Sequence, residues 1–199
     1  FAFHSPTWAN LQPLVCYLSE QHRQEDERFL RILTSLRKAV VTKEHRAQLN
    51  ERCVHSEDLL ESDMTRLYSH NADVDRINND RLEHIDGLTK TFHMQEKGKP
   101  ALVEQIKRGC LSPEQLLLKE GAVVMFTKNN PKGEFVNGTL GVVKGWDKHT
   151  KCPIVITKSG RSIKTEPVEW TIEDNGRVLA RVQQIPLRLA WAMTVHKSQ

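Results

Sequence analysis

The stretch Thr65-Arg-Leu-Tyr-Ser69-His70-Asn71, with the segment that follows it to residue 87, decides the fold class. Residues 65–69 have the β-branched and aromatic content of a short strand. Behind them, apolar residues recur at helical spacing and mark one buried face: Val74, Ile77, Leu82 and Ile85. Gly87 is a plausible stop for this helix. A strand, a polar turn and an amphipathic helix form the unit of α/β folds, so the sequence predicts an α/β domain.

The first block of the chain, to about residue 93, reads as helices around this one short strand. Apolar residues again follow a helical period, at Phe29, Ile32, Leu33 and Leu36. Acidic residues at 25–27 would occupy the first turn of that helix, where they offset its dipole. Residues 94–120 are polar and interrupted by Gly and Pro. We expect a short helix near residues 102–107 and a connector through 116–118.

From Gly121 the sequence becomes β-rich. Six short strands are expected, at residues 123–127, 139–143, 154–157, 162–165, 169–172 and 178–182. Asn175-Gly176 is a strong hairpin signal, and Ser159-Gly160 separates another pair. Short strands at this spacing predict a small barrel. The apolar segment 187–195 could be strand or helix, because its period favours neither.

Charge is unevenly distributed along a nearly balanced chain. The net charge is +4, from 29 basic and 25 acidic residues, whereas residues 128–164 contain Lys or Arg at eight positions and only Glu134 and Asp147 as acids. A locally basic surface suits a phosphate backbone. A solvated lysine-rich face explains the same pattern equally well.

Several classes of protein are excluded. The longest apolar runs are far shorter than the roughly 20 residues of a membrane span, and no secretory signal is visible. The four cysteines form no C-x-x-C pair, which indicates reduced thiols in a cytoplasm-like compartment. Phosphate-binding loops, nucleophile elbows and H-E-x-x-H pairs are absent, so the chain does not read as a complete enzyme.

Three polar segments nevertheless lie at element boundaries, where loops carry function on a rigid scaffold. They are Leu18 to Gln24, Leu67 to Asn71 and Thr194 to Gln199. In this order they resemble motifs IV, IVa and V of superfamily 1B DNA helicases of the RecD/Pif type. The match to motif V extends over Ile185-Pro-Leu-Arg-Leu-Ala-Trp-Ala-Met-Thr194-Val-His196-Lys197-Ser198-Gln199 and is the most specific.

Two further stretches resemble the same family. The opening Phe1-Ala-Phe-His-Ser-Pro-Thr-Trp8 is similar to the tail of a first RecA-like domain. The stretch Gly121 to Asn129, with Asn137-Gly138 and Gly141-Val-Val143, is similar to the entry of an SH3-like insert. The resemblance implies an α/β, RecA-like (P-loop NTPase-type) second helicase domain, incomplete at both ends, with an inserted small SH3-like β-barrel. The implied segments are 1–20 (first-domain tail), 21–135 (second domain), 136–183 (insert) and 184–199 (second domain, continued).

The resemblance also implies roles for individual residues. Arg23 would act catalytically on the γ-phosphate of ATP as an arginine finger, and the nucleotide-binding set would be Arg23, Gln24, Lys197 and Gln199. DNA would be bound by Ser69, His70, Asn71, Thr194 and His196, with Lys144 and Lys158 adding electrostatic hold. ATP and Mg²⁺ would be held mainly by the absent first domain, and no residue of this chain is expected to bind metal. A capping turn before the helix is the alternative explanation for His70 and Asn71.

The implied function is an ATP-dependent DNA helicase of DNA repair or recombination that moves 5′ to 3′ on single-stranded DNA. In the full-length protein it would be an enzyme, whereas this chain alone would be inactive. A monomer in the bacterial cytoplasm or nucleoid is expected, with no membrane partner. Two alternatives stay open: a non-catalytic nucleic-acid-binding module, and a RecD-like subunit of a helicase–nuclease complex. Trp146 and Trp170 would either fill the barrel core, which we favour, or stack on bases.

Overall fold

The computed structural model describes residues 1–16, 26–53 and 65–195, which form two compact units, Phe1–Glu61 and Ser62–Gln199. The first unit contains only helices among these described residues: η1 (Ala2–His4), α1 (Pro6–Leu11), α2 (Glu27–Arg37) and α3 (Lys43–Asn50). Asp26 caps α2 by accepting a hydrogen bond from the Phe29 amide, which confirms the acidic start predicted for this helix. Thr42 and His45 form a reciprocal capping box on α3.

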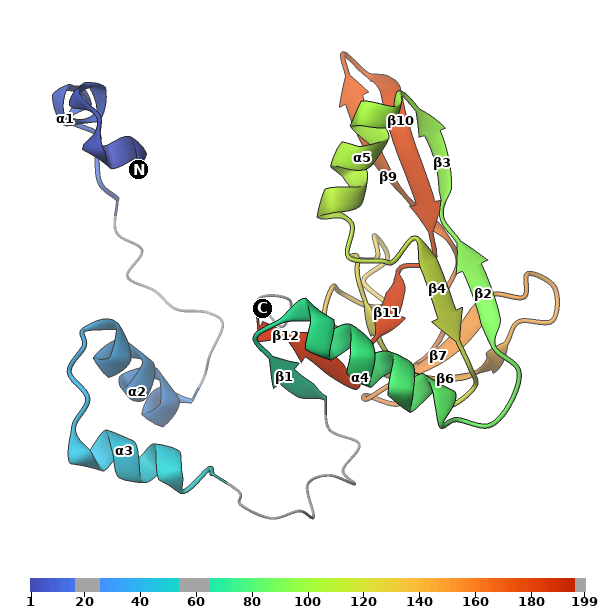
Figure 1. Ribbon diagram of the computed structural model, residues 1–199, viewed down its shortest axis with the longest axis horizontal. Coiled ribbons are helices and arrows are strands. Elements are labelled where there is room, and N and C mark those ends of the chain that lie inside the picture. Colours follow the sequence, from blue (N-terminus) through green and yellow to red (C-terminus); the bar gives the residue numbers. More distant parts are fainter. Residues whose placement is uncertain (17–25, 54–64, 196–199) are drawn as a thin grey trace. The chain divides into compact units, whose positions relative to one another are not determined.

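The second unit begins with the strand and helix predicted from the sequence. They are β1 (Arg66–Tyr68) and α4 (Asn71–Glu83) (Figure 1). The buried residues of α4 are Val74, Asn78 and Leu82, spaced four apart, while Ile77 and Ile85 are half-buried. The buried stripe therefore includes a polar residue, whose partners are described below.

Between α4 and the β-rich region lie three strands that the sequence did not indicate, β2, β3 (Gln95–Gly98) and β4. β2 (Lys90–His93) pairs antiparallel with β4 (Gln115–Leu118), so residues 116–118, expected to be a connector, are a strand. Residues 116–118 are three consecutive leucines, two of which are buried. They lack the alternation of polar and apolar residues that indicates a strand. The short helix expected near residues 102–107 is confirmed and is longer, as α5 (Pro100–Gly109).

Six of the remaining strands match the predicted β-rich segments. They are β5 (Val123–Phe126), β6 (Leu140–Trp146), β7 (Pro153–Thr157), β8 (Ser162–Lys164), β9 (Val168–Asp174) and β10 (Arg177–Gln184). Asn175 and Gly176 both have positive φ and close the β9–β10 hairpin between the paired residues Asp174 and Arg177, as the Asn-Gly signal predicted. The apolar segment after Pro186 forms two strands, β11 (Leu187–Leu189) and β12 (Ala192–Thr194).

These strands form open sheets, and the SH3-like barrel is not confirmed. The five-stranded sheet has the order β11-β5-β6-β7-β8, with β11 and β8 at its edges, and no sheet closes on itself within the described residues. It also crosses the expected borders of the insert, since β5 precedes residue 136 and β11 follows residue 183. β9 and β10 lie in a separate sheet, in which β10 pairs with β3 (Gln95–Gly98), a strand that lies before the expected insert. Strand spacing alone did not reveal these long-range partners.

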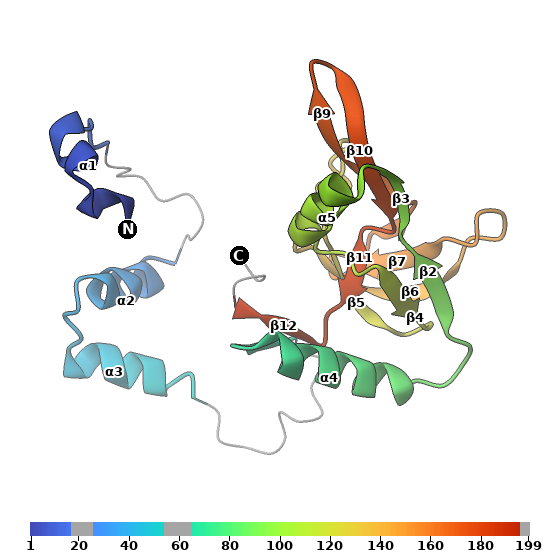
Figure 2. The same cartoon turned by 45° about the horizontal axis from the view of Figure 1, so that its top comes forward.

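Two sets of polar contacts, made by Lys107 and Gln184, hold α5 and β10 to their neighbours. α5 lies along β10 beside the β9–β10 hairpin (Figure 2), and Lys107 on α5 forms ion pairs with three carboxylates, Glu96 at 2.6 Å, Glu114 at 3.0 Å and Glu104 at 3.3 Å. Hydrogen bonds to Glu96 and then Glu114 raise the pKa of Lys107. The buried Gln184 amide donates to the carbonyls of Phe92, Pro113 and Glu114, and so joins β10 to β2 and to the start of β4.

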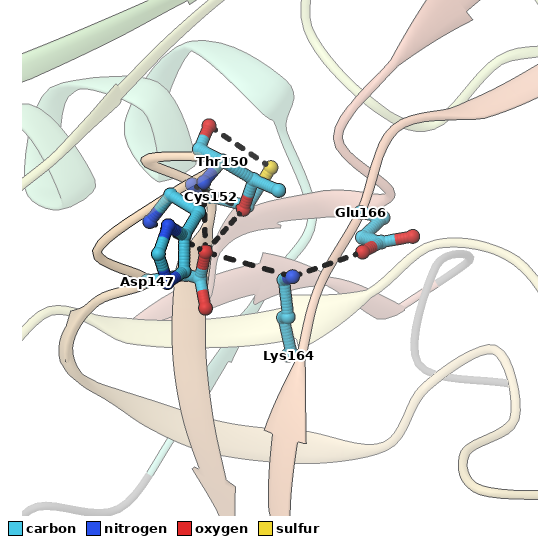
Figure 3. A network of polar contacts seen from close by, with 6 residues as sticks. Asp147, Thr150, Cys152, Lys164 and Glu166 are labelled. Carbon is cyan, nitrogen blue, oxygen red and sulfur yellow. Dashed lines mark hydrogen bonds and ion pairs between the residues drawn. The ribbon is translucent and has the colours of Figure 1, made fainter.

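The main core lies on one face of the five-stranded sheet. Its completely buried members include Val124, Phe126, Val143, Val155 and Leu187. The turn between β6 and β7 is held separately by Asp147, which accepts hydrogen bonds from the Thr150 amide (2.7 Å), the Thr150 hydroxyl (2.9 Å) and the His149 amide (3.0 Å). Lys164 lies between Asp147 and Glu166 (Figure 3).

Candidate nucleic-acid interface

Two strands that lie far apart in the sequence meet at the site. β1 pairs in parallel with β12, with Tyr68 opposite Thr194. The Arg66 amide donates to the Trp191 carbonyl at 2.8 Å, and the Thr65 hydroxyl donates to the Ala190 carbonyl at 2.8 Å. Because the strands are parallel, their carboxyl ends open at the same edge. The segments that resemble motifs IVa and V therefore lie side by side.

Asn78 fixes this pair of strands to α4. Its side-chain amide donates to the Ala192 carbonyl at 2.9 Å and accepts from the Ala192 amide at 2.9 Å, and it lies 3.5 Å from the Leu189 carbonyl. Asn78 is 4% exposed, so these bonds satisfy groups that water does not reach. The helix cannot slide along β12 without breaking them, and this sets where the first turn of α4 lies relative to Thr194.

Ser69, His70 and Asn71 occupy the carboxyl edge and are all exposed. The Ser69 hydroxyl and His70 Nδ1 are 2.8 Å apart and share a hydrogen bond. His70 is the N-cap of α4, yet its side chain makes no capping hydrogen bond. The alternative explanation, a capping turn at His70 and Asn71, is thus met by the position of His70 but not by a hydrogen bond from its side chain. Helix N-termini favour anions, so the first turn of α4 suits an anionic ligand.

The structure describes only some of the sequence-predicted residues. Thr194 lies at the same edge as Ser69 and His70 and is 3% exposed, while the next residue, Val195, is 48% exposed. Arg23, Gln24, His196, Lys197 and Gln199 lie outside the described residues. Four of the seven residues expected to bind DNA are thus brought together: Ser69, His70, Asn71 and Thr194.

Lys144 and Lys158 lie elsewhere. Both line a groove of 660 Å³ together with Arg81 and His84, which belong to the last turn of α4 and its end. A 13-residue helix is about 20 Å long at a rise of roughly 1.5 Å per residue. The two lysines and the β1/β12 carboxyl edge are therefore at opposite ends of α4.

Trp146 and Trp170 pack against cores and do not stand free. Trp146 is half-buried against the main core, with the Phe92 ring 6.0 Å away and the Lys90 ammonium 4.2 Å from its ring centre. Trp170 is half-buried against a second core that includes Val103, Ile106 and Val182, and the Lys128 ammonium lies 4.9 Å from its ring centre. This agrees with the packing role favoured from the sequence, although the cores belong to open sheets.

Within residues 1–16, 26–53 and 65–195, no group of three or more His, Cys, Asp or Glu side chains could hold a metal ion. In the same ranges, no helix is long and apolar enough to cross a bilayer.

Sequence reasoning missed two features of this region. Asn78 is a polar residue within the stripe Val74–Asn78–Leu82, and this interruption of an apolar stripe was the available signal for its structural role. The groove formed by Arg81 and His84 with Lys144 and Lys158 had no sequence signal, because its parts are some 60 to 80 residues apart and meet only through the packing of α4.

Comparison with known proteins identifies relatives. No family model matches the chain. It is 34% identical over 257 residues to the ATP-dependent DNA helicase Pif1 of a Psychrobacter species, with all of this chain and 38% of the relative covered. It is 32% identical over 201 residues to the ATP-dependent DNA helicase PIF1 of Xenopus laevis, again with the whole chain and 32% of the relative covered. The chain thus spans about a third of the length of these curated relatives.

Solved structures of Pif1 proteins also match this chain. A Bacteroides Pif1 in complex with ADP-AlF4 matches 90% of this chain with a TM-score of 0.74 and 27% identity, over 42% of its own length. A Bacteroides Pif1 in complex with ADP-AlF3 and single-stranded DNA matches 92% of this chain with a TM-score of 0.59 and 27% identity, also over 42% of its length.

Proposed function

Since the chain belongs to the Pif1-type helicases of superfamily 1B, we propose that it is the part of an ATP-dependent DNA helicase that holds single-stranded DNA at the carboxyl edge of β1 and β12. One observation carries the proposal. The parallel pairing of these strands gathers Ser69, His70, Asn71 and Thr194, which come from segments more than 120 residues apart. A packing contact alone would not require three of them to be exposed polar residues.

The chemistry of this edge suits a phosphate backbone. Hydroxyl, imidazole and amide side chains donate hydrogen bonds to phosphate oxygens without reading base sequence, as a motor that moves along DNA requires. The first turn of α4 adds amides that no side chain of His70 caps. His196, which follows Thr194 by two residues, would extend the same contact.

The nucleotide side of the proposal rests on Arg23, Gln24, Lys197 and Gln199. Arg23 would place a guanidinium on the γ-phosphate and stabilise the charge that develops during phosphoryl transfer. Lys197 and Gln199 follow β12 directly, so one short segment would contact DNA at its start and nucleotide at its end. Such a segment couples the two ligands, because each biases the position of the other. As the resemblance implies, ATP and magnesium would be held mainly by the other RecA-like domain.

Hydrolysis of ATP by the full-length protein, with and without oligo-dT, tests this function. We expect DNA-stimulated hydrolysis in the wild type, a loss of about three to five orders of magnitude in Arg23→Ala, and an unchanged rate in the control Arg37→Ala, which removes an exposed arginine of α2. Chain 1–199 alone is expected to be inactive. Translocation on tailed duplexes would then be measured for the expected 5′-to-3′ direction.

The outcomes separate the proposals. Stimulated hydrolysis that survives Arg23→Ala would keep the helicase and remove Arg23 from its cleft. Absence of hydrolysis in the wild type, with DNA binding intact, would leave a non-catalytic binding module.

A further inference from the structure

Ser69 and His70 make a contact of their own in the link between β1 and α4. β1 ends at Tyr68 and α4 begins at Asn71, so these two residues form the whole link. The Ser69 hydroxyl and His70 Nδ1 lie 2.8 Å apart and share a hydrogen bond. Both residues are exposed, and within the described part of the chain the second ring nitrogen of His70, Nε2, makes no hydrogen bond.

This contact accounts for the missing cap of α4. An N-cap side chain ordinarily accepts a hydrogen bond from an amide of the first helical turn. His70 occupies the N-cap position with extended backbone angles, φ −118° and ψ 141°, yet its side chain makes no capping hydrogen bond. Nδ1 is the ring nitrogen nearer to the backbone, and it is already bonded to Ser69. The bond to Ser69 therefore takes the place of a capping bond.

The same bond restricts where the imidazole of His70 carries its hydrogen. A hydroxyl has one hydrogen to donate, and in a neutral imidazole the bond made by one nitrogen decides which nitrogen is protonated. When the Ser69 hydroxyl donates to Nδ1, the ring hydrogen is on Nε2. When the imidazole is protonated, Nδ1 donates to the Ser69 oxygen and Nε2 again carries a hydrogen. Both arrangements make Nε2 a donor.

A phosphate oxygen distinguishes these two arrangements from the remaining one. In a neutral ring with its hydrogen on Nδ1, Nε2 would present a lone pair, and the oxygens of a phosphodiester have no hydrogen to donate to it. Nε2 also lies across the ring from Nδ1, so the bond that holds Nδ1 at Ser69 turns Nε2 away from Ser69. A bound strand thus requires one of the two arrangements in which Nε2 is a donor.

We propose that Ser69 is a positioning residue for DNA, which keeps a hydrogen on Nε2 of His70 so that His70 donates to a phosphate oxygen of the strand. Ser69 then acts on the strand through His70, because the single hydrogen of its hydroxyl is used by Nδ1 when the ring is neutral. This inference rests on the proposed function, since it needs the edge of β1 and β12 to hold single-stranded DNA.

A double-mutant cycle separates this role from a direct contact between Ser69 and DNA. The affinity of the full-length protein for labelled oligo-dT is measured by fluorescence anisotropy in the wild type, Ser69→Ala, His70→Ala, His70→Gln and Ser69→Ala/His70→Gln. A glutamine at position 70 has an amide group that donates whatever residue occupies position 69. Ser69→Thr keeps the hydroxyl. Ser35→Ala is the matched control, because it removes a serine hydroxyl that lies 3.5 Å from another histidine, His45.

We expect Ser69→Ala to weaken binding about three- to tenfold, the effect of one hydrogen bond. Ser69→Thr and Ser35→Ala should keep wild-type affinity, and in the His70→Gln background Ser69→Ala should change affinity by less than about twofold. An equal loss in both backgrounds, or no loss in Ser69→Ala while His70→Ala binds weakly, would overturn the inference and leave the proposed DNA edge in place. Wild-type affinity in both Ser69→Ala and His70→Ala would remove the proposed edge as well.

The position of the ring hydrogen is measured without DNA, and so independently of the proposed function. Long-range ¹H–¹⁵N correlation spectra of deuterated protein with ¹⁵N-labelled histidine show which ring nitrogen carries a hydrogen, and the signals of His70 are those missing from His70→Gln. We expect a hydrogen on Nε2 in the wild type and a mixture of both neutral forms in Ser69→Ala. A bare Nε2 in the wild type, or unchanged His70 signals in Ser69→Ala, would overturn the inference.

Discussion

Asn78 is the residue through which α4 is bound to β12, and it gives the sharpest test of the site's framework. Replacing it with Ala leaves the Ala192 amide and carbonyl without their partner in a buried position. Each unsatisfied group costs roughly 1–3 kcal/mol, so we expect Asn78→Ala to lose a few kcal/mol of unfolding free energy. Urea unfolding measures this loss. Asn79→Ala, at the exposed neighbouring position, should stay within about 0.5 kcal/mol of wild type; equal effects in both variants would refute the role given to Asn78.

Asp147 makes stability depend on pH. The Thr150 amide and hydroxyl, the His149 amide and Lys164 hold the pKa of this carboxyl well below its usual range. A depressed folded-state pKa contributes stability above the unfolded value, about 3.9, and this contribution is lost as pH falls through the folded value. We therefore expect the melting temperature of wild type to fall more steeply below about pH 4 than that of Asp147→Asn, with the variant less stable at pH 7. Calorimetry between pH 2 and 7 measures both curves, and parallel curves would contradict this.

Residues of the candidate site were predictable to unequal degrees. Ser69, His70 and Asn71 follow a short strand, so their place at a strand end could be read locally. Their meeting with Thr194 depends on the parallel pairing of β1 with β12, which no local pattern encodes. The resemblance to helicase motifs supplied that link instead. Lys144 and Lys158 were chosen by charge alone, and charge does not say which end of α4 a lysine is near.

At the scale of elements, the strands β5 to β10 were predictable because Val, Ile or Thr recur in them and turn residues separate several of them, whereas the segment that forms β11 and β12 could not be assigned from its period. Their partners were not. β9 and β10 read as part of one small barrel with β5 to β8, yet β10 pairs with β3 some 80 residues earlier. A strand's period gives its buried face, whereas its neighbours follow from packing, here from α5 on β10 and from the hydrogen bonds of Gln184.

Gly98 makes the β3–β10 pairing possible. Its φ is +125°, and a Cβ at this position would lie 2.6 Å from the Ala180 Cα and 2.6 Å from the Leu179 carbonyl oxygen. We expect Gly98→Ala to lower the free energy of unfolding by about 1–3 kcal/mol through backbone strain alone. The variant should also weaken the pairing of β3 with β10. Gly109→Ala, at the end of α5 with no atom within 4 Å of the added Cβ, should be neutral or up to about 1 kcal/mol more stable. Urea unfolding of the pair compares them directly, and equal costs would exclude the close approach as the cause.

At the scale of the whole molecule, the two units differ in how much of their structure is buried. In the described part of Phe1–Glu61, Ile32 is the only buried apolar residue, while Phe29, Leu33 and Leu36 on the same helix are 39–48% exposed. Ser62–Gln199 contains all three core clusters. Helices that bury so few apolar side chains have little beyond their own hydrogen bonds to oppose local opening.

The rates of amide hydrogen exchange in chain 1–199 should therefore differ between Phe1–Glu61 and Ser62–Gln199. Amides of α2 and α3 are expected to exchange at least about a hundredfold faster than those of β6, β7 and β10, because opening the sheets exposes residues such as Val143, Val155 and Val182, which are completely buried. Mass spectrometry of peptides from each unit measures the rates. Equal protection of α2 and β6 would mean that Phe1–Glu61 is stabilised by burial that its described residues do not contain. Faster exchange would support a division in which Ser62–Gln199 is the more rigid unit and carries the candidate site at the ends of β1 and β12.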